Sequence, residues 1–221
     1  MGAAAAALAN HEGCGPDLIY LPEVPFDLNR FLEDVKNIYK ENGNVIVAVS
    51  EGIRDKNGKH IAEMGTDLSQ DAFGHALLGG TAAVLASMAR DNIAKKVRAI
   101  EFSLLQRCAA HIASQTDIYE SYNAGSMAVR LAVEGTTDRM VGFKRGNNTR
   151  GEYECDIKLI NLGDAANFEK KVPAEWINKD GNGVSSEFIK YALPLIQGEV
   201  RVPFEQGLPR FANLKKIPVN R

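Results

Sequence analysis

Three side chains have types and positions suited to binding a small anionic metabolite: Glu51, Arg98 and Arg107. Glu51 directly follows the apolar run VIVAV, and Gly52 beside it leaves room for a ligand to approach. Arg98 stands at the start of the apolar run VRAIEF, and Arg107 lies just beyond its end. A guanidinium group presents a rigid fork of N–H donors that fits phosphate oxygens, whereas a carboxylate accepts hydrogen bonds from hydroxyl groups. These residue types therefore indicate a site for a phosphorylated, hydroxyl-bearing ligand.

Spacing leaves two alternatives open for each kind of side chain. The two arginines lie at opposite ends of one predicted strand, roughly 20 Å apart at the rise of a β-strand. They cannot both hold one phosphate from the same subunit, so Arg98 either serves a site on a neighbouring copy or forms an ordinary surface ion pair. Because a buried, unpaired carboxylate is costly, Glu51 either points into a ligand crevice or pairs with an arginine at the same sheet edge.

The elements that must position these residues alternate between strand and helix. Apolar runs predict strands within 17–26, 44–52 and 97–103, and spacings of three and four predict helices over 27–43 and 81–92. Continuous burial in VIVAV favours a parallel sheet covered on both faces, and ligands of such sheets bind outside the carboxyl ends of the strands. We therefore expect an α/β fold, a layered and mostly parallel sheet with flanking helices.

Weaker patterns complete the expected fold. Alanine-rich residues 3–11 predict a small helix, and Asn57-Gly58 predicts a tight hairpin. A long helix is expected over 118–134, strands over 139–145 and 153–160, and a last helix from Ser185 that Pro194 kinks or ends. The stretch after Arg201, with its prolines, predicts a tail without regular structure.

Composition excludes several classes of function. The 221 residues carry a formal net charge of −2 and have a pI near 6.1, so no overall attraction to nucleic acid or anionic lipid is expected. No segment is apolar over the length of a membrane span, and the start MGAAAAALANHEG lacks the basic region of a signal peptide. Three widely spaced cysteines predict reduced thiols. Together these features predict a cytoplasmic protein with neither nucleic acid nor membrane as a partner.

Some patterns resemble sites without completing them. Asn178, Asp180 and Asn182 imitate the start of a calcium loop, but Ile189 stands where a bidentate carboxylate is required, so a turn is predicted. The four histidines are scattered, and no glycine-rich phosphate loop follows any strand. We therefore expect no metal ligands within this sequence.

Five stretches in order carry a family resemblance: LIYLPEVPF, VAVSEG, DAFGH, VRAIEFSLLQRCAAH and FEKKVPAEWI. With these the chain resembles the 6-phosphofructokinases, and most of all the pyrophosphate-dependent branch, the diphosphate–fructose-6-phosphate 1-phosphotransferases. The resemblance spans residues 1–197 and leaves 198–221 as a C-terminal tail. It implies two lobes, of which this chain is similar to the one that binds fructose 6-phosphate.

The resemblance also implies roles for individual residues. Glu51 matches the family's sugar-contacting glutamate, Arg107 the arginine at the end of the substrate loop, and Arg98 the phosphate-binding arginine contributed across a subunit interface. Leu104 occupies a position where relatives often have histidine or tyrosine, which implies the loss of one hydrogen bond to the sugar phosphate. Met1 and Gly2 match the first two residues of the Met-Gly-Arg substrate motif, and Ala3 takes the place of the arginine.

The family's donor loop and its Thr-Ile-Asp-Asn-Asp stretch, with the catalytic aspartate, have no counterpart in residues 1–221. The resemblance thus implies a homo-oligomeric glycolytic phosphotransferase in which another lobe binds pyrophosphate, or ATP, with Mg²⁺. Our first hypothesis is that this chain supplies the sugar-phosphate site of such an enzyme and is inactive by itself. The alternative is a truncated, catalytically inactive paralogue that binds a sugar phosphate or acts as a regulatory subunit.

Overall fold

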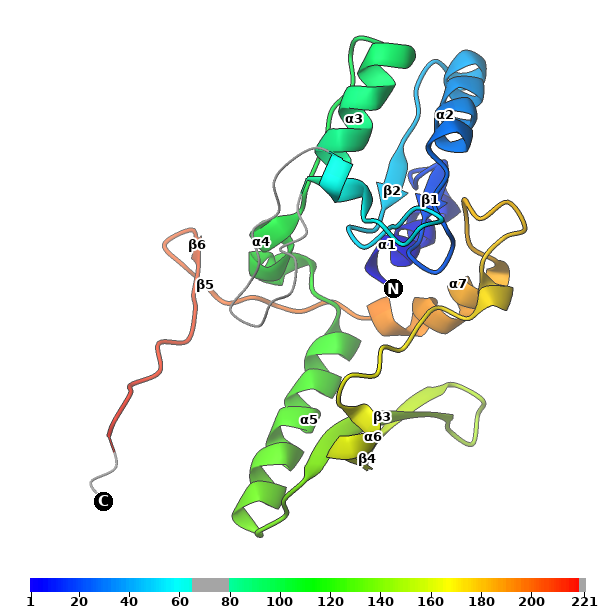
Figure 1. Ribbon diagram of the computed structural model, residues 1–221. Helices are drawn as coiled ribbons and strands as arrows, with labels where there is room; N and C mark the ends of the chain where they lie inside the picture. The colour runs from blue at the N-terminus through cyan, green and yellow to red at the C-terminus, as the bar shows by residue number, and fades with distance from the viewer. Residues whose placement is uncertain (65–79, 219–221) are drawn as a thin grey trace. The chain divides into compact units, whose positions relative to one another are not determined.

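The computed structural model describes residues 1–64 and 80–218, which form two compact units. Unit 1 comprises Met1–Phe102 and Gly163–Pro194, and unit 2 comprises Ser103–Leu162 and Leu195–Arg221. The ribbon in Figure 1 follows the chain through both. The domain boundary after residue 197 implied by the family resemblance stays a prediction. Neither described part contains a helix long and apolar enough to cross a membrane.

Unit 1 is built on a β–α–β unit. Strand β1 (Leu18–Tyr20) is followed by helix α2 (Leu28–Asn42) and strand β2 (Val47–Val49), and the two strands pair in parallel with Ile19 opposite Ala48. Helix α2 begins as predicted, because the Asp27 carboxylate accepts hydrogen bonds from the backbone N–H groups of Asn29 and Arg30. The predicted α/β fold and the parallel pairing of its first two strands are confirmed.

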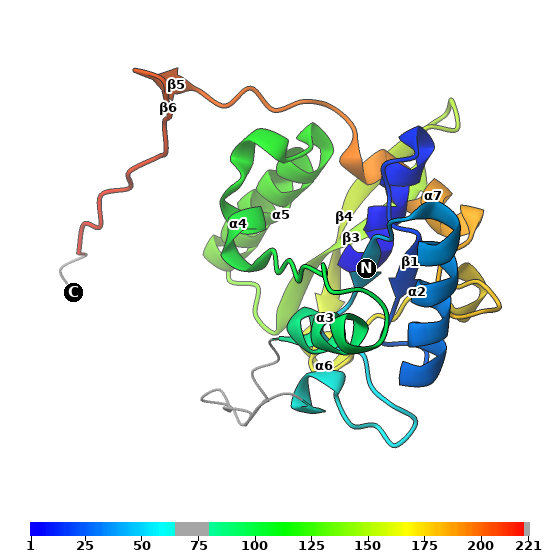
Figure 2. The same cartoon turned by 90° about the horizontal axis from the view of Figure 1, so that it is seen from above.

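Both faces of this sheet are covered. On one face Leu18 and Tyr20 pack with Phe31 and Val35 of α2. The other face packs against α1 (Gly2–Ala5), η1 (Ala6–Glu12) and α7 (Ser186–Ala192) in a cluster that consists of Ile19, Leu21, Ala4, Ala7, Val172, Phe188 and Ala192. Figure 2 shows the sheet and these helices from above. The predicted N-terminal helix is confirmed, and its alanines allow close packing.

Further elements of unit 1 follow the expected order. The hairpin at 55–59 is confirmed by the antiparallel bridge between Arg54 and His60, with Gly58 at a φ of 81°. After it come η2 (Ile61–Met64) and α3 (Thr81–Asn92), and later in the chain α6 (Leu162–Ala165) and η4 (Ala174–Trp176). Helix α7 ends at Ala192, before Pro194, and η5 (Leu193–Ile196) continues from it. Residues 65–79, between η2 and the start of α3, lie outside the described part of the chain.

Two expectations for the sheet are wrong. Residues 97–102 form no strand, and α4 (Ser103–Cys108) begins where the strand was expected to end. Ile100 and Phe102 are 71% and 67% exposed, so the apolar side chains that would stabilise a third strand find no surface to pack on among the described residues. Strand β2 consequently has no described partner beyond β1 and is only half-buried, where we expected full burial.

Unit 2 consists of α4, η3 (Ala110–Ile112), α5 (Gln115–Val133) and a hairpin of β3 (Arg139–Asn147) and β4 (Tyr153–Asn161). One face of α5 packs on the hairpin (Figures 1 and 2), and the Tyr153 hydroxyl donates to Glu120 Oε1 at 2.7 Å. The opposite face carries a second apolar stripe of exposed side chains, namely Ile118, Tyr122, Val129 and Val133. None of the described residues of unit 2 is buried. This unit therefore lacks a core of its own.

The C-terminal part of unit 2 matches the predicted irregular tail. Its regular structure is limited to β5 (Phe204–Glu205) and β6 (Leu208–Pro209), which pair as a short antiparallel ribbon. Most side chains of the described tail are exposed.

Candidate functional site

Glu51 lies in the tight turn that ends β2, at the carboxyl end of the parallel pair. The turn is closed by a hydrogen bond from Ile53 N–H to the Ser50 carbonyl at 3.3 Å. Thr81, only 1% exposed at the start of α3, donates its hydroxyl to the Glu51 carbonyl at 3.2 Å. The Glu51 side chain is exposed, and no described residue forms an ion pair with it. A carboxylate held in this way presents its oxygens as acceptors for a hydroxyl-bearing ligand.

Arg98 lies in the extended segment after α3 and is exposed. Of the described residues, none makes an ion pair with its guanidinium group, so the alternative of an ordinary surface ion pair gains no support within this part of the chain. Met1 and Gly2 are also exposed, at the start of α1. Unit 1 thus contains four of the six residues singled out from the sequence.

Leu104 and Arg107 both lie on α4, in unit 2. Leu104 is 67% exposed, and Arg107 is exposed without an ion-pair partner among the described residues. The two side chains are three residues apart on a helix, which places them on neighbouring positions of its surface. The convergence of Arg98, Arg107 and Glu51 on one ligand stays a prediction, as do the roles assigned to all six residues.

A polar network supports the parallel sheet on the side of α2. The Tyr20 hydroxyl on β1 donates to Asp34 Oδ2 at 2.8 Å, and the Asn182 side-chain amide donates to the same oxygen at 2.9 Å. Burial, followed by the hydrogen bond to Asp34, raises the pKa of Tyr20. The backbone N–H of Ile19 donates to the Asn182 carbonyl at 2.8 Å. The loop that imitates a calcium site is therefore a turn, as predicted, and the structure shows that it is fixed against β1 and α2.

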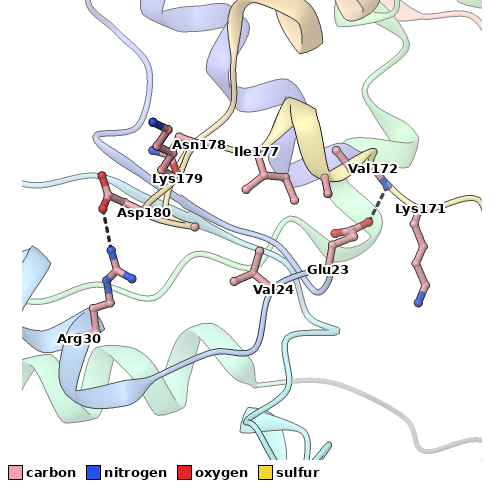
Figure 3. Close-up of a pocket in the computed structure, with 11 residues that line it drawn as sticks. Glu23, Val24, Arg30, Lys171, Val172, Ile177, Asn178, Lys179 and Asp180 are labelled. Atoms are coloured by element: carbon pink, nitrogen blue, oxygen red, sulfur yellow. Dashed lines mark hydrogen bonds and ion pairs between the residues drawn. The ribbon is translucent and has the colours of Figure 1, made fainter.

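A pocket of about 440 Å³ opens beside this turn (Figure 3). Its wall is formed by the segment after β1, by Arg30 of α2 and by residues 171–181. The Glu23 carboxylate accepts a hydrogen bond from the Val172 backbone N–H at 2.8 Å, and Arg30 pairs with Asp180 at 2.9 Å. None of the six residues singled out from the sequence lines this pocket. Sequence patterns did not indicate this pocket, because its walls are about 150 residues apart in the chain.

Known proteins match this chain over nearly its whole length. The family model of the phosphofructokinases matches residues 1–132. The chain belongs to the phosphofructokinase family. It is 40% identical, over 99% of its length, to the "Pyrophosphate--fructose 6-phosphate 1-phosphotransferase" of Halomonas elongata, and 38% identical, over 98%, to the protein of the same name from Methylococcus capsulatus. The resemblance to the pyrophosphate-dependent branch is thereby confirmed.

A solved structure supports the same family and the fold. The pyrophosphate-dependent phosphofructokinase from Nitrosospira multiformis matches 99% of this chain with a TM-score of 0.79 and 33% sequence identity. The match covers 50% of that chain, and the two curated relatives are covered to 51% of their own length. The present chain thus spans about half the length of the phosphofructokinases it matches.

Four of the five stretches that carry the resemblance lie within the described residues. LIYLPEVPF forms β1 and the wall of the pocket, VAVSEG forms β2 and the Glu51 turn, and FEKKVPAEWI leads into η4. VRAIEFSLLQRCAAH runs through the extended segment into α4. The DAFGH stretch, residues 71–75, lies outside the described part of the chain.

Proposed function

We propose that this chain forms the fructose 6-phosphate-binding portion of a pyrophosphate-dependent phosphofructokinase. The observation that carries the proposal is the 40% identity, sustained over 99% of the chain, to a protein named as that phosphotransferase. The position of the exposed Glu51 in the turn at the carboxyl end of the parallel strands supports it, since α/β sheets bind ligands there. The reaction is transfer of the terminal phosphoryl group of pyrophosphate to the C1 hydroxyl of fructose 6-phosphate.

In this proposal the residues of the chain bind and orient the sugar phosphate. Glu51 accepts hydrogen bonds from sugar hydroxyls, and Arg107 binds the sugar phosphate through its N–H donors. Arg98 holds the 6-phosphate of the substrate bound to a neighbouring copy, which makes the working form a homo-oligomer. Met1 and Gly2 flank the same substrate, and Leu104 offers it only an apolar side chain. Holding the acceptor in line for attack contributes through positioning.

Phosphoryl transfer also needs a donor site, a metal ion and a base that orients the nucleophile. The described residues contain no group of three or more histidine, cysteine, aspartate or glutamate side chains that could hold a metal ion. Mg²⁺ therefore enters the proposal as an ion bound by the rest of the complete protein, and no step is assigned to it here. We place the enzyme in the cytoplasm.

The surface of unit 2 supports assembly with further polypeptide. Its described residues include no buried side chain, and the outer stripe of α5 exposes Tyr122 and Val129 by 73% and 66%. A unit without a core is not stable by itself, because apolar burial must offset the entropy of ordering the chain. We propose that this surface is covered in the complete enzyme.

The second candidate is a non-catalytic protein that binds a sugar phosphate or regulates a longer phosphofructokinase. The two candidates share the sugar-phosphate site and differ in turnover when the chain is combined with the missing half of a relative.

Calorimetric titration of the chain with fructose 6-phosphate tests the shared site. We expect saturable binding that Glu51→Gln weakens, since the amide replaces one acceptor oxygen by a donor. Glu41→Gln, an exposed substitution near the end of α2, serves as the matched control and keeps the wild-type affinity. Equal affinities of Glu51→Gln and wild type would remove Glu51 from the site.

A coupled assay then separates the two candidates. The chain is mixed with the non-matching half of the Halomonas elongata relative, with pyrophosphate, Mg²⁺ and fructose 6-phosphate. Turnover above that of either part alone supports the first candidate, in which the chain is a portion of the enzyme. Sugar-phosphate binding with no turnover in a confirmed complex of the two parts favours the non-catalytic protein.

A further inference from the structure

Glu23 lines the pocket beside the 178–183 turn, and one of its carboxylate oxygens is a buried acceptor that no described group satisfies. Glu23 Oε1 accepts the Val172 backbone N–H at 2.8 Å, which fixes the orientation of the carboxylate (Figure 3). Glu23 Oε2 is buried and has no hydrogen-bond partner among the described residues. A buried carboxylate oxygen without a donor is costly, and native structures rarely leave one. The pocket therefore favours a ligand that brings a hydrogen-bond donor to this oxygen.

Charged groups at the pocket favour an anionic ligand. Three cationic side chains line it, Arg30, Lys171 and Lys179, against the carboxylates of Glu23 and Asp180. The contact between Arg30 Nη2 and Asp180 Oδ1 uses one N–H direction of a guanidinium group that has five N–H donors. The Arg30 side chain is half exposed, so donors remain for a phosphate group.

Apolar side chains and a glycine shape the rest of the wall. Val24, Val172 and Ile177 line the pocket, and Figure 3 shows Val24 and Ile177 between Glu23 and the Arg30–Asp180 pair. Gly181 has a φ of 71°, and a Cβ atom there would lie 3.0 Å from Val24 Cγ1. The turn can approach Val24 this closely because residue 181 has no side chain. A wall of this kind suits a short carbon chain between a donor and an anionic group.

We propose that this pocket binds a small organic phosphate that carries hydroxyl groups. A hydroxyl donates to Glu23 Oε2, the carbon chain lies along the apolar wall, and the phosphate contacts Arg30 and Lys179. Residue Glu51 takes no part in it. The site is therefore additional to the one proposed for the phosphotransferase substrate and does not depend on that function.

Glycerol 3-phosphate is a suitable probe, with glycerol and inorganic phosphate as its two separate parts. Trp176, the single tryptophan, lies between the lining residues Ala174 and Ile177, so its fluorescence reports on the pocket. We expect saturable binding by calorimetry with a matching change in Trp176 fluorescence, and weaker binding of either part alone. No binding of glycerol 3-phosphate by the wild-type chain up to about 10 mM overturns the proposal.

Variants locate the bound probe. Glu23→Gln keeps a carbonyl oxygen for the Val172 N–H but can no longer offer two acceptor oxygens, and we expect affinity to fall about tenfold. Lys179→Gln should weaken binding several-fold and make the affinity less dependent on salt, because the substitution removes one exposed charge. Glu187→Gln removes an exposed carboxylate whose ion-pair partner among the described residues is Lys190, and it is the matched control with unchanged affinity. Thermal unfolding by circular dichroism confirms that each variant is folded.

Two outcomes overturn the assignment even when the wild-type chain binds the probe. One is wild-type affinity in both Glu23→Gln and Lys179→Gln. The other is loss of binding in Glu51→Gln with retention in Glu23→Gln, which would place the probe at the proposed substrate site. Failure of fructose 6-phosphate to bind has no bearing on this pocket, so the two proposals fail separately.

Discussion

The hydrogen bond from Thr81 to the Glu51 turn can be separated from the packing of the same side chain. Thr81→Val removes the hydroxyl that donates to the Glu51 carbonyl at 3.2 Å and keeps the volume. Since Glu51 is exposed and this hydrogen bond is only partly buried, the expected loss of unfolding free energy is about 1 kcal/mol. Thr81→Ser keeps the hydroxyl but removes a methyl group from a side chain that is 1% exposed, which also costs about 1 kcal/mol.

The two variants should therefore match in stability and differ in ligand affinity. If Glu51 binds fructose 6-phosphate as proposed, the Thr81→Val protein must order the Glu51 turn when the ligand binds. A cost of about 1 kcal/mol corresponds to a roughly fivefold higher Kd. Thr81→Ser should retain the wild-type Kd. Urea unfolding followed by circular dichroism gives the stabilities, and calorimetry with fructose 6-phosphate gives the affinities. Equal Kd values for the two variants would refute the idea that Thr81 positions Glu51.

Three further predictions concern the sheet, the outer face of α5 and catalysis. The pKa of Tyr20 is raised above its ordinary value of 10.0, so the contribution of this side chain to stability is present below pH 10 and is lost as the pH rises beyond it. Tyr20→Phe should therefore flatten the fall in unfolding free energy at alkaline pH. An unchanged pH profile of the variant would contradict this. The purified chain should self-associate in sedimentation experiments, because the outer face of α5 is apolar and exposed. The double substitution Tyr122→Glu and Val129→Glu should reduce self-association, whereas Ser121→Glu on the same helix should not. A monodisperse wild-type monomer would count against this prediction. The purified chain alone should phosphorylate no fructose 6-phosphate with pyrophosphate or with ATP and Mg²⁺, and reproducible turnover in a coupled assay would show that prediction to be wrong.

Local signals predicted the first half of unit 1 well. Helix α2 could be placed from Asp27 and Gly43 because both ends depend on short-range chemistry, a side-chain cap and a left-handed C-terminal residue. The parallel pairing of β1 and β2 followed from the continuous apolar run, since the connecting helix leaves little choice of direction. The turn at 178–183 could be distinguished from a calcium loop because Ile189 cannot bind the ion.

The third strand could not be predicted from its own sequence. VRAIEF has the β-branched and aromatic residues of a strand, yet a strand forms only where a neighbour supplies hydrogen bonds and a surface for burial. In the described part of unit 1, Ile100 and Phe102 find no such surface. The apolar pattern of this segment was correctly recognised, whereas its conformation depends on tertiary contacts that the sequence of the segment does not contain.

The candidate site was likewise predictable only in part: the sequence indicated individual residues but not the pocket. Residue types indicated Glu51, Arg98 and Arg107 because carboxylate and guanidinium groups have few uses in apolar surroundings other than pairing or binding. The pocket around Glu23 was missed because Glu23 looked like one acidic residue in the run LPEVPF, and its significance lies in a contact with Val172, 149 residues away. A single sequence offers no signal for such a distant pair.

Exposure of the two arginines has a consequence for how an anion site would form. Arg98 and Arg107 have no ion-pair partner among the described residues, and both side chains are exposed, so each keeps its hydration in this state of the chain. A phosphate gains little from one exposed guanidinium, because water and salt screen the interaction. The gain becomes large when donors converge in a site from which water is excluded. Under the proposed function, association through the outer face of α5 should therefore increase the affinity for the sugar phosphate. Tyr122→Glu should weaken fructose 6-phosphate binding although Tyr122 belongs to no ligand site. An unchanged affinity in that variant, with association abolished, would show that the site is complete within one copy.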